Sequence, residues 1–290
     1  MSKKPTQLYS NQKSPISFAS IIGASFGISL VVGAIIHGGQ SYGGFLSLEG
    51  FMIVIGGTLA VAFMSFQANY VLDALVAIGS MFRKASVTHE NLHRDMIDVI
   101  AWARVVKEKG LRGLEDVLGA RRINDPFVRY GLDMVVSNYT PDDVRSMMET
   151  AADAYYKRDT TPARVLMAMA SHAPAFGMVG TLIGMVIMLG SFDGDMSRIG
   201  KGLAISLLAT LYGVVSARMF YMPASAKVMQ KQDNLRFRNY LITEGMVMLV
   251  ANKTPIHIQD RLNSFLKPGL HQRIGSGTPK KPTDKPAEKR

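Results

Sequence analysis

Two long apolar stretches in the second half of the chain carry small and polar residues in matched positions. The first contains 174–184, PAFGMVGTLIG, and the second contains 206–213, SLLATLYG, with Pro223 after its end. Only His172 is ionisable between 165 and 190. Glycines three or four residues apart let another backbone approach closely, and a hydroxyl at mid-membrane depth needs a hydrogen-bond partner. We therefore expect this pair of stretches to hold another helix and to accommodate a polar group beside it.

The composition agrees with a membrane protein that has a cytosolic part. The chain has 290 residues, of which 48% are hydrophobic and 19% charged, and its mean hydropathy is +0.13. It contains no Cys, which excludes disulfides, zinc fingers and thiol catalysis. The net charge of +11 is concentrated in 224–290, with 13 basic and 5 acidic residues. We assign this basic excess to contact with an anionic leaflet and not to nucleic acid.

The hydropathy pattern predicts four membrane spans, at 16–36, 48–66, 168–190 and 201–222. The first is long enough to be a retained helix instead of a cleaved signal peptide. The connector 37–47 has no Lys or Arg, and 191–200 has only Arg198, whereas basic residues are frequent elsewhere. The positive-inside rule therefore places both termini and the segment 69–164 in the cytoplasm.

These observations predict an all-α integral membrane protein, with four transmembrane helices in a 2+2 arrangement and a helical cytoplasmic domain. The expected divisions are a cytoplasmic N-terminus (1–15), a first transmembrane hairpin (16–66), a cytoplasmic helical domain (67–164), a second transmembrane hairpin for the ion path and the partner (165–223), a cytoplasmic helical segment (224–266) and a basic disordered tail (267–290).

The cytoplasmic part has recognisable helix signals. Apolar residues recur at three- and four-residue spacing over 92–106, and Gly110 offers a stop before a short helix at 111–119. Helix starts are marked by Asp125 followed by Pro126, and by Thr140 followed by Pro141 with Asp143 three residues after the cap. Pro162 predicts a break or kink before the third span, and 224–252 is predicted to be an amphipathic helix.

No catalytic or metal-binding constellation is apparent, so we do not expect an enzyme. His89 and His93 are spaced i, i+4 as a metal pair would be, but no third ligand has recognisable spacing. The glycine pairs at 43–44 and 56–57 lack the strand–glycine–helix context of a nucleotide loop.

Thr181 and Thr210 are candidate ion-path residues because both fall close to mid-bilayer with glycines nearby. The alternative is that each hydroxyl bonds a carbonyl of its own helix. Pro174 and Pro223 are either simple kinks or sites where freed carbonyls take part in function. The predicted spans contain no acid apart from Glu49 at the outer edge of the second. An acidic group for ion transport would therefore have to come from a partner helix.

The motif at 174–184 resembles the third span of flagellar stator A-subunits, the MotA/PomA family, and TLYG at 210–213 with Pro223 is similar to their fourth. Residues 244–245 and 252–255 match the tail pattern of that family loosely. The resemblance covers about residues 16–266.

The resemblance implies a pentamer around two copies of a MotB- or PomB-like B-subunit, which supplies an ion-binding Asp, in the bacterial inner membrane. It implies an ion path at Thr181 and Thr210, a torque or conformational role for Pro174 and Pro223, and contact with a rotor switch-complex protein. The rotor-facing positions that carry over are Lys107, Glu108, Glu115 and Asp116. Glu108 departs from relatives that have a second basic residue there.

Sodium is favoured over protons as the coupling ion, and no cofactor or bound metal is expected. In the family, Thr at position 181 is the sodium-type residue, whereas Ala209 counts against sodium because that pattern has two adjacent Thr. The alternative function is a TolQ/ExbB-type energy-coupling subunit, which has one span before the loop. A scaffold without an ion path also remains open, and a self-sufficient transporter is disfavoured by the missing acid.

Overall fold

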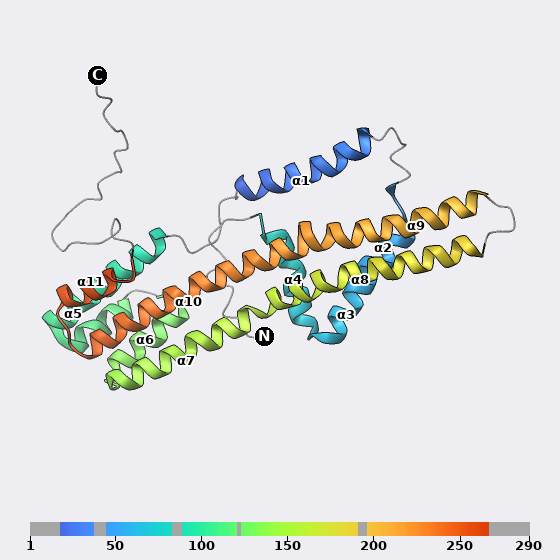
Figure 1. Cartoon of the computed structure of the whole chain (residues 1–290). Coiled ribbons are helices and arrows are strands. Elements are labelled where there is room, and N and C mark those ends of the chain that lie inside the picture. Colours follow the sequence, from blue (N-terminus) through green and yellow to red (C-terminus); the bar gives the residue numbers. More distant parts are fainter. Residues whose placement is uncertain (1–17, 38–44, 83–88, 121–122, 191–195, 267–290) are drawn as a thin grey trace, which may run out of the picture. The chain divides into compact units, whose positions relative to one another are not determined.

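A computed structural model of the chain describes residues 18–37, 45–82, 89–120, 123–190 and 196–266, and every regular element in these ranges is a helix (Figure 1). The predictions for 1–15 and for the tail at 267–290 concern residues outside these described ranges. In chain order the elements are α1 (Phe18–His37), α2 (Leu48–Phe51), the π-helix η3 (Met52–Gly56), α3 (Gly57–Ser65), α4 (Ala68–Ser80), α5 (His89–Ala120), α6 (Pro126–Val136), α7 (Pro141–Asp159), α8 (Thr161–Leu189), α9 (Met196–Val215), the π-helix η4 (Ser216–Tyr221), α10 (Met222–Val250) and α11 (Pro255–Asn263).

The helices form two compact units, each assembled from two separate segments. The first unit combines 1–88 with 153–236, and the second combines 89–152 with 237–290. Residues distant in sequence therefore share each core, and helices α7 and α10 each contribute residues to both units.

Three helices among the described residues are long and apolar enough to cross a membrane. The first covers 48–65 and corresponds to the predicted second span. The other two are the long helical stretches 141–189 and 199–250, which contain the predicted third and fourth spans. In α1 the apolar helix covers only Ser20–Leu30. The all-helical class with membrane-type helices is thus established, while the count of four spans stays a prediction.

The first unit contains a helix that the sequence patterns did not single out. Helix α4 follows α3 after a turn at Phe66, whose backbone is extended. Its Val71 and Ala74 are fully buried against α8 residues such as Met169, in a core that also includes Tyr221. Val71, Ala74 and Ile78 recur at helical spacing on the packed side, but the exposed apolar residues Leu72 and Val76 between them hide this stripe in the sequence.

The predicted helix caps and the predicted helix stop are present in the structure. The Asp125 carboxylate accepts from the backbone N–H of Phe127 (2.9 Å) and Val128 (3.3 Å) at the start of α6. The Thr140 hydroxyl accepts from the N–H of Asp143 (3.2 Å) at the start of α7. Gly110 has a φ of 69° and interrupts α5, which confirms the predicted stop.

The interruption predicted at Pro162 lies two residues earlier. Helix α7 ends at Asp159 and α8 begins at Thr161, so Thr160 alone separates them, with backbone angles that are still helical. Pro162 sits in the first turn of α8, where its missing N–H costs no helical hydrogen bond. The Thr160 hydroxyl donates to the Tyr156 carbonyl at 2.8 Å, which satisfies an acceptor at the end of α7.

The prediction of an amphipathic helix at 224–252 is wrong for its second half. All residues of α10 from 241 to 249 are buried, because the α10 residues of the second unit contact α5, α6, α7 and α11. Gly245 permits this packing, since a Cβ atom there would lie 2.8 Å from a methyl of Val99 on α5.

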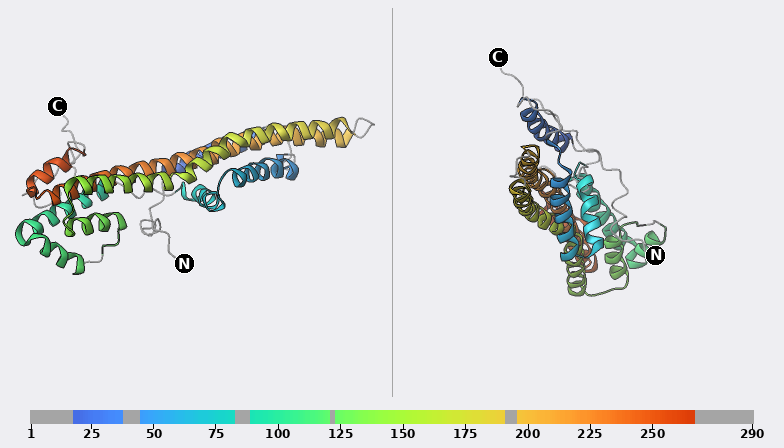
Figure 2. Two further views of the ribbon diagram at one scale, coloured as in Figure 1. Left: turned by 90° about the horizontal axis from the view of Figure 1, so that it is seen from below. Right: turned by 90° about the vertical axis from the view of Figure 1, so that its right-hand side faces the viewer.

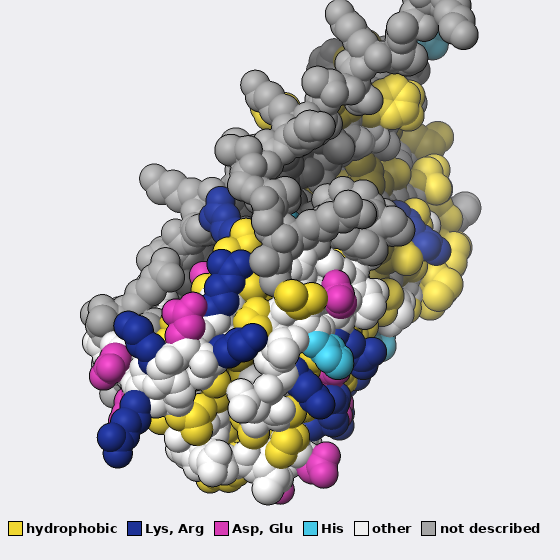
Figure 3. All heavy atoms as spheres, turned by 90° about the vertical axis from the view of Figure 1, so that its left-hand side faces the viewer, with side chains coloured by type: hydrophobic (Ala, Val, Ile, Leu, Met, Phe, Trp, Pro, Cys, Tyr) yellow, Lys and Arg dark blue, Asp and Glu magenta, His cyan; other side chains and the backbone are white. Residues whose placement is uncertain are grey.

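The face of the molecule drawn in Figure 3 carries basic, acidic and apolar side chains side by side, so it is neither uniformly basic nor uniformly acidic.

Candidate functional site

Helices α8 and α9 pack against each other as an antiparallel pair, side by side in Figures 1 and 2. A Cβ atom added at Gly184 would lie 2.3 Å from Ser206 Oγ and 2.6 Å from the Gly202 carbonyl oxygen. One added at Gly180 would lie 2.3 Å from the Ala209 Cβ. The glycines of the 174–184 motif are therefore used inside the chain. The expectation that these small residues let another backbone approach closely is met by α9 of the same chain.

Ser206 is a polar contact within this pair that the sequence reasoning did not single out. It is 5% exposed, and its hydroxyl lies 3.0 Å from the Thr181 carbonyl and 3.1 Å from the Gly202 carbonyl. Bonding across two apolar helices fixes their register, since a hydroxyl in an apolar layer loses free energy when unpaired. The sequence did contain a signal for this contact, because Ser206 lies four residues before the candidate ion-path residue Thr210 and therefore near it on the helix surface.

One side of the pair is covered by α2, η3 and α3, which together form the predicted second span. A Cβ atom at Gly57 on α3 would lie 2.3 Å from the Phe176 ring of α8, and one at Gly50 on α2 would lie 3.4 Å from the Ala209 backbone nitrogen of α9. A Cβ atom at Gly180 on α8 would lie 3.8 Å from a methyl of Ile53 on η3. The elements α2, η3 and α3 thus line one side of the α8–α9 pair.

Thr181 and Thr210 lie on another side of the pair, and the structure brings them to neighbouring levels. A Cβ at Gly177, one turn before Thr181, would lie 3.1 Å from the Thr210 Cα. At 3.6 residues per turn, neither threonine points toward the first hairpin. Exposed apolar side chains accompany them there, namely Met178, Leu182 and Leu207, at 62%, 58% and 64% exposure. We call this side the open face.

The Thr181 hydroxyl donates to the Met178 carbonyl of its own helix at 2.6 Å. This is the local hydrogen bond that sequence analysis offered as the alternative to an ion site, formed to i−3 instead of i−4. The Thr181 oxygen retains its lone pairs as acceptors toward the open face, so the bond fixes the rotamer without consuming the oxygen. Thr210 is exposed.

Pro174 and Pro223 lie in different parts of the first unit, one inside α8 and the other at the start of α10. The Pro174 Cα would be 3.2 Å from a Cβ at Gly213, so this proline sits in the α8–α9 contact close to Thr210. Ser225, two residues after Pro223, donates to the Ala163 carbonyl at 2.8 Å, near the start of α8. The π-helix η4 ends directly before α10, in whose first turn Pro223 lies. A widened turn at this point accommodates a residue that cannot continue the regular hydrogen-bond ladder.

The four predicted rotor-facing residues all lie on α5 and all are exposed: Lys107, Glu108, Glu115 and Asp116. Gly110 separates the first two from the last two with its non-helical backbone. The structure therefore leaves all four side chains accessible on the second unit, on two helical segments instead of one continuous face.

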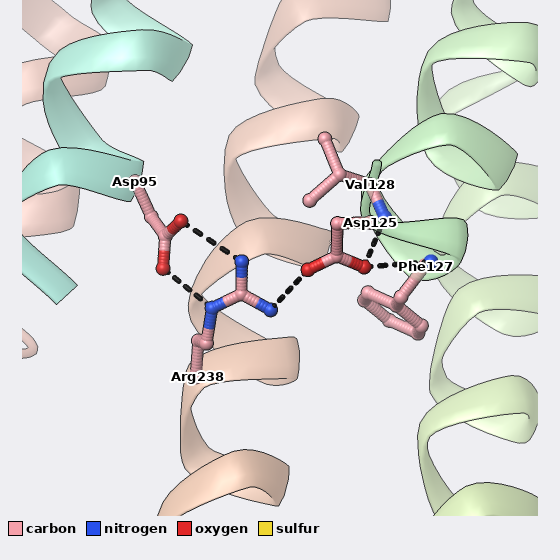
Figure 4. Close-up of polar contacts among 5 residues, drawn as sticks. All are labelled: Asp95, Asp125, Phe127, Val128 and Arg238. Carbon is pink, nitrogen blue, oxygen red and sulfur yellow. Dashed lines mark hydrogen bonds and ion pairs between the residues drawn. The ribbon is translucent and has the colours of Figure 1, made fainter. Parts of the chain in front are cut away.

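A buried charge cluster in the second unit was not predicted (Figure 4). Arg238 on α10 has a side chain only 3% exposed, and its guanidinium pairs with both oxygens of Asp95 on α5 and, at 2.6 Å, with Asp125. The other oxygen of Asp125 caps α6. One arginine thus joins three helices, in the forked geometry that guanidinium groups favour.

Glu244 forms a second ionic link in the same unit, outside the predicted spans. It pairs with Arg145 on α7 at 2.8 Å and with Arg261 on α11 at 2.9 Å. Burial alone would raise the pKa of Glu244, but the hydrogen bonds and charges of the two arginines outweigh it and hold that pKa below its ordinary value. Among the residues that the structure describes, no group of three or more metal-ligating side chains lies together.

Comparison with known proteins gives consistent relatives. Residues 119–238 match the family model of the MotA/TolQ/ExbB proton channel family. The protein YtxD of Bacillus subtilis is 32% identical over 240 residues, which cover 82% of this chain and 86% of YtxD. The chemotaxis protein PomA of Vibrio alginolyticus is 29% identical over 254 residues, covering 88% and 97% of the two chains. The fold is similar to a chain of the C. jejuni MotAB structure, with a TM-score of 0.76 at 19% identity, covering 87% of this chain and 97% of that one.

Proposed function

Because the chain belongs to the MotA/PomA family, we propose that it is the ion-driven, torque-generating A-subunit of a bacterial flagellar stator. The observation that carries the proposal is the open face. The hydroxyls of Thr181 and Thr210 lie there at neighbouring levels among exposed apolar side chains, and Pro174 lies close by in the α8–α9 contact. Such a face fits an apolar partner helix that brings one acidic group, because a lone carboxylate in a membrane needs polar neighbours.

The partner in this proposal is a MotB- or PomB-like B-subunit, whose membrane helix supplies the acid absent from the predicted third and fourth spans. Solved MotAB complexes of related fold support a partner of this kind. We further propose five copies of this chain around two B-subunits in the inner membrane, with four spans in the 2+2 arrangement and both termini cytoplasmic. The distribution of basic residues supports that orientation.

The proposal is tested by motility in a strain that lacks its stators. Expression of this chain together with its B-subunit is expected to restore swimming, whereas this chain alone should neither conduct ions nor restore it. Swimming with this chain alone would contradict the need for an external acid. Tagging the 37–47 connector from the periplasmic side separates this proposal from the TolQ/ExbB-type alternative, because that type has no first hairpin.

Torque is proposed to reach a rotor switch-complex protein through the exposed charges on α5. Reversing charge at Lys107 or Glu115 is expected to reduce torque while ion leak through the complex is unchanged. Each exposed contact contributes about 0–1 kcal/mol, so single variants should be mild and the double variant severe. Tethered-cell torque and cytoplasmic ion uptake are the two measurements. A double variant with normal torque would remove these residues from the rotor contact.

The coupling ion is proposed to be sodium. Na⁺ must exchange hydration water for several oxygens, and in this proposal the Thr181 and Thr210 hydroxyls on the open face supply two of them, with backbone carbonyls near Pro174 supplying others. We expect swimming speed to saturate with external Na⁺ at fixed pH and ionic strength, and the half-saturating concentration to rise in Thr181→Ala. Speed that is indifferent to Na⁺ and abolished by a protonophore would identify protons instead.

A further inference from the structure

The Tyr212 hydroxyl joins α9 to the beginning of the first hairpin's second helix. It donates to the Phe45 carbonyl at 2.6 Å and accepts from the Ser47 N–H at 3.0 Å. These contacts bridge more than 160 residues of sequence. Ser47 is in turn the N-cap of α2, since its hydroxyl accepts from the Gly50 N–H at 3.1 Å. The phenol therefore holds the backbone on which α2 starts.

A second contact ties the same turn to α9. Glu49, in the first turn of α2, pairs with Lys201 at 2.9 Å, and Ser47 Oγ donates to the Glu49 carboxylate at 3.3 Å. Both members of the ion pair are well exposed, at 47% and 66%. Exposed pairs of this kind stabilise little. Tyr212 is the stronger of the two attachments, because losing its hydroxyl leaves an N–H and a carbonyl at the edge of an apolar layer without their partner.

The position of Tyr212 relates this attachment to the open face. Thr210 precedes Tyr212 by two residues, so at 3.6 residues per turn their side chains point to nearly opposite sides of α9. Rotating or sliding α9 against the first hairpin would therefore move Thr210 relative to Thr181. The glycine contacts between α8 and α9 set how closely the two helices approach, and the Ser206 hydrogen bond to the Thr181 carbonyl fixes α9 on α8 at one point, four residues before Thr210. Tyr212 attaches α9 to the start of α2 at a second point, two residues after Thr210.

We propose that Tyr212 is a positioning residue for the ion path. Its two hydrogen bonds fix the rotation and depth of α9 against α2, and they thereby hold Thr210 beside Thr181 on the open face. The attachment itself is a property of the fold, whereas its effect on ion use rests on the proposed function.

The test compares Tyr212→Phe, which keeps the ring and removes the hydroxyl, with Tyr221→Phe as a matched control. Tyr221 is 5% exposed in the same continuous helix, and its hydroxyl has no hydrogen bond to any residue that the structure describes. Since the chain has no native Cys, a Thr181→Cys/Thr210→Cys background reports directly on the two positions by thiol cross-linking in membranes. The full chain is expressed with its B-subunit throughout.

Loss of these hydrogen bonds is expected to lower the cross-linking rate about fivefold in Tyr212→Phe and to leave the control unchanged. In the Cys-free chain, Tyr212→Phe should raise the half-saturating concentration of the coupling ion about fivefold, with maximal speed little altered. That concentration is read from swimming speed against Na⁺ at fixed pH and against pH at fixed Na⁺.

Unchanged cross-linking overturns the proposal, and so does reduced cross-linking with unchanged ion dependence, because Tyr212 would then be structural only. If the unmodified chain with its B-subunit fails to swim, the proposed function fails. The cross-linking arm still decides the attachment in that case, with an unchanged rate counting against it.

Discussion

Replacing Gly184 with leucine is expected to abolish motility and to lower the amount of folded protein in the membrane. A Cβ atom alone would lie 2.6 Å from the Gly202 carbonyl oxygen, which is backbone and cannot rotate away. The α8–α9 pair would have to separate, and the Ser206 hydrogen bond to Thr181 would be lost with it. Overpacking by smaller additions already costs about 1–3 kcal/mol, and a leucine here adds four carbons.

Gly200→Leu is the matched control for this prediction. Gly200 belongs to α9 of the same hairpin, and a Cβ there would meet nothing within 4 Å. This variant should accumulate and support swimming as the unmodified chain does. The measurements are membrane abundance, the thermal midpoint of the complex purified with its B-subunit, and swimming speed. Normal abundance and swimming in Gly184→Leu would show that the close helix contact is not required.

Replacing Arg238 with methionine is expected to destabilise the second unit by about 3–5 kcal/mol. The substitution leaves the carboxylates of Asp95 and Asp125 together without the guanidinium that neutralises both (Figure 4). Removing one partner of a buried ionic group is costly because the remaining charges are not returned to water. Arg238→Lys should be intermediate, since an ammonium lacks the planar fork that reaches two carboxylates at once.

Arg129→Met is the control, because Arg129 pairs with Asp133 at 4.0 Å with both side chains about two-thirds exposed. Such a pair contributes at most a fraction of a kcal/mol, roughly 0.3–0.5 for i, i+4 pairs on a helix. Thermal unfolding and protease resistance of the purified complex compare the variants. Equal midpoints for Arg238→Met and Arg129→Met would mean that the buried cluster contributes no net stability.

The local features of the fold could be predicted from the sequence. Three helix boundaries are examples: the cap at Asp125, the cap at Thr140 and the stop at Gly110. Each depends on residues within about one helical turn, so a short stretch of sequence is enough to predict it. The apolar stretches likewise predicted membrane-type helices, because hydrophobic length is a property of consecutive residues. Thr181 and Thr210 were selected in the same way, from hydroxyls in the middle of apolar runs, and their role in an ion path stays a prediction.

What the tertiary structure decided was which residues meet. The sequence indicated that the glycines of 174–184 receive another backbone, but only the packing assigned that backbone to α9 of the same chain. Asp125 was predicted as a cap, and its second oxygen turned out to pair with Arg238, 113 residues later. Tyr212 and Ser47 are separated by 165 residues. Contacts of this kind depend on the relative placement of whole helices, which arises from the summed burial of many side chains, and no short stretch of sequence encodes it.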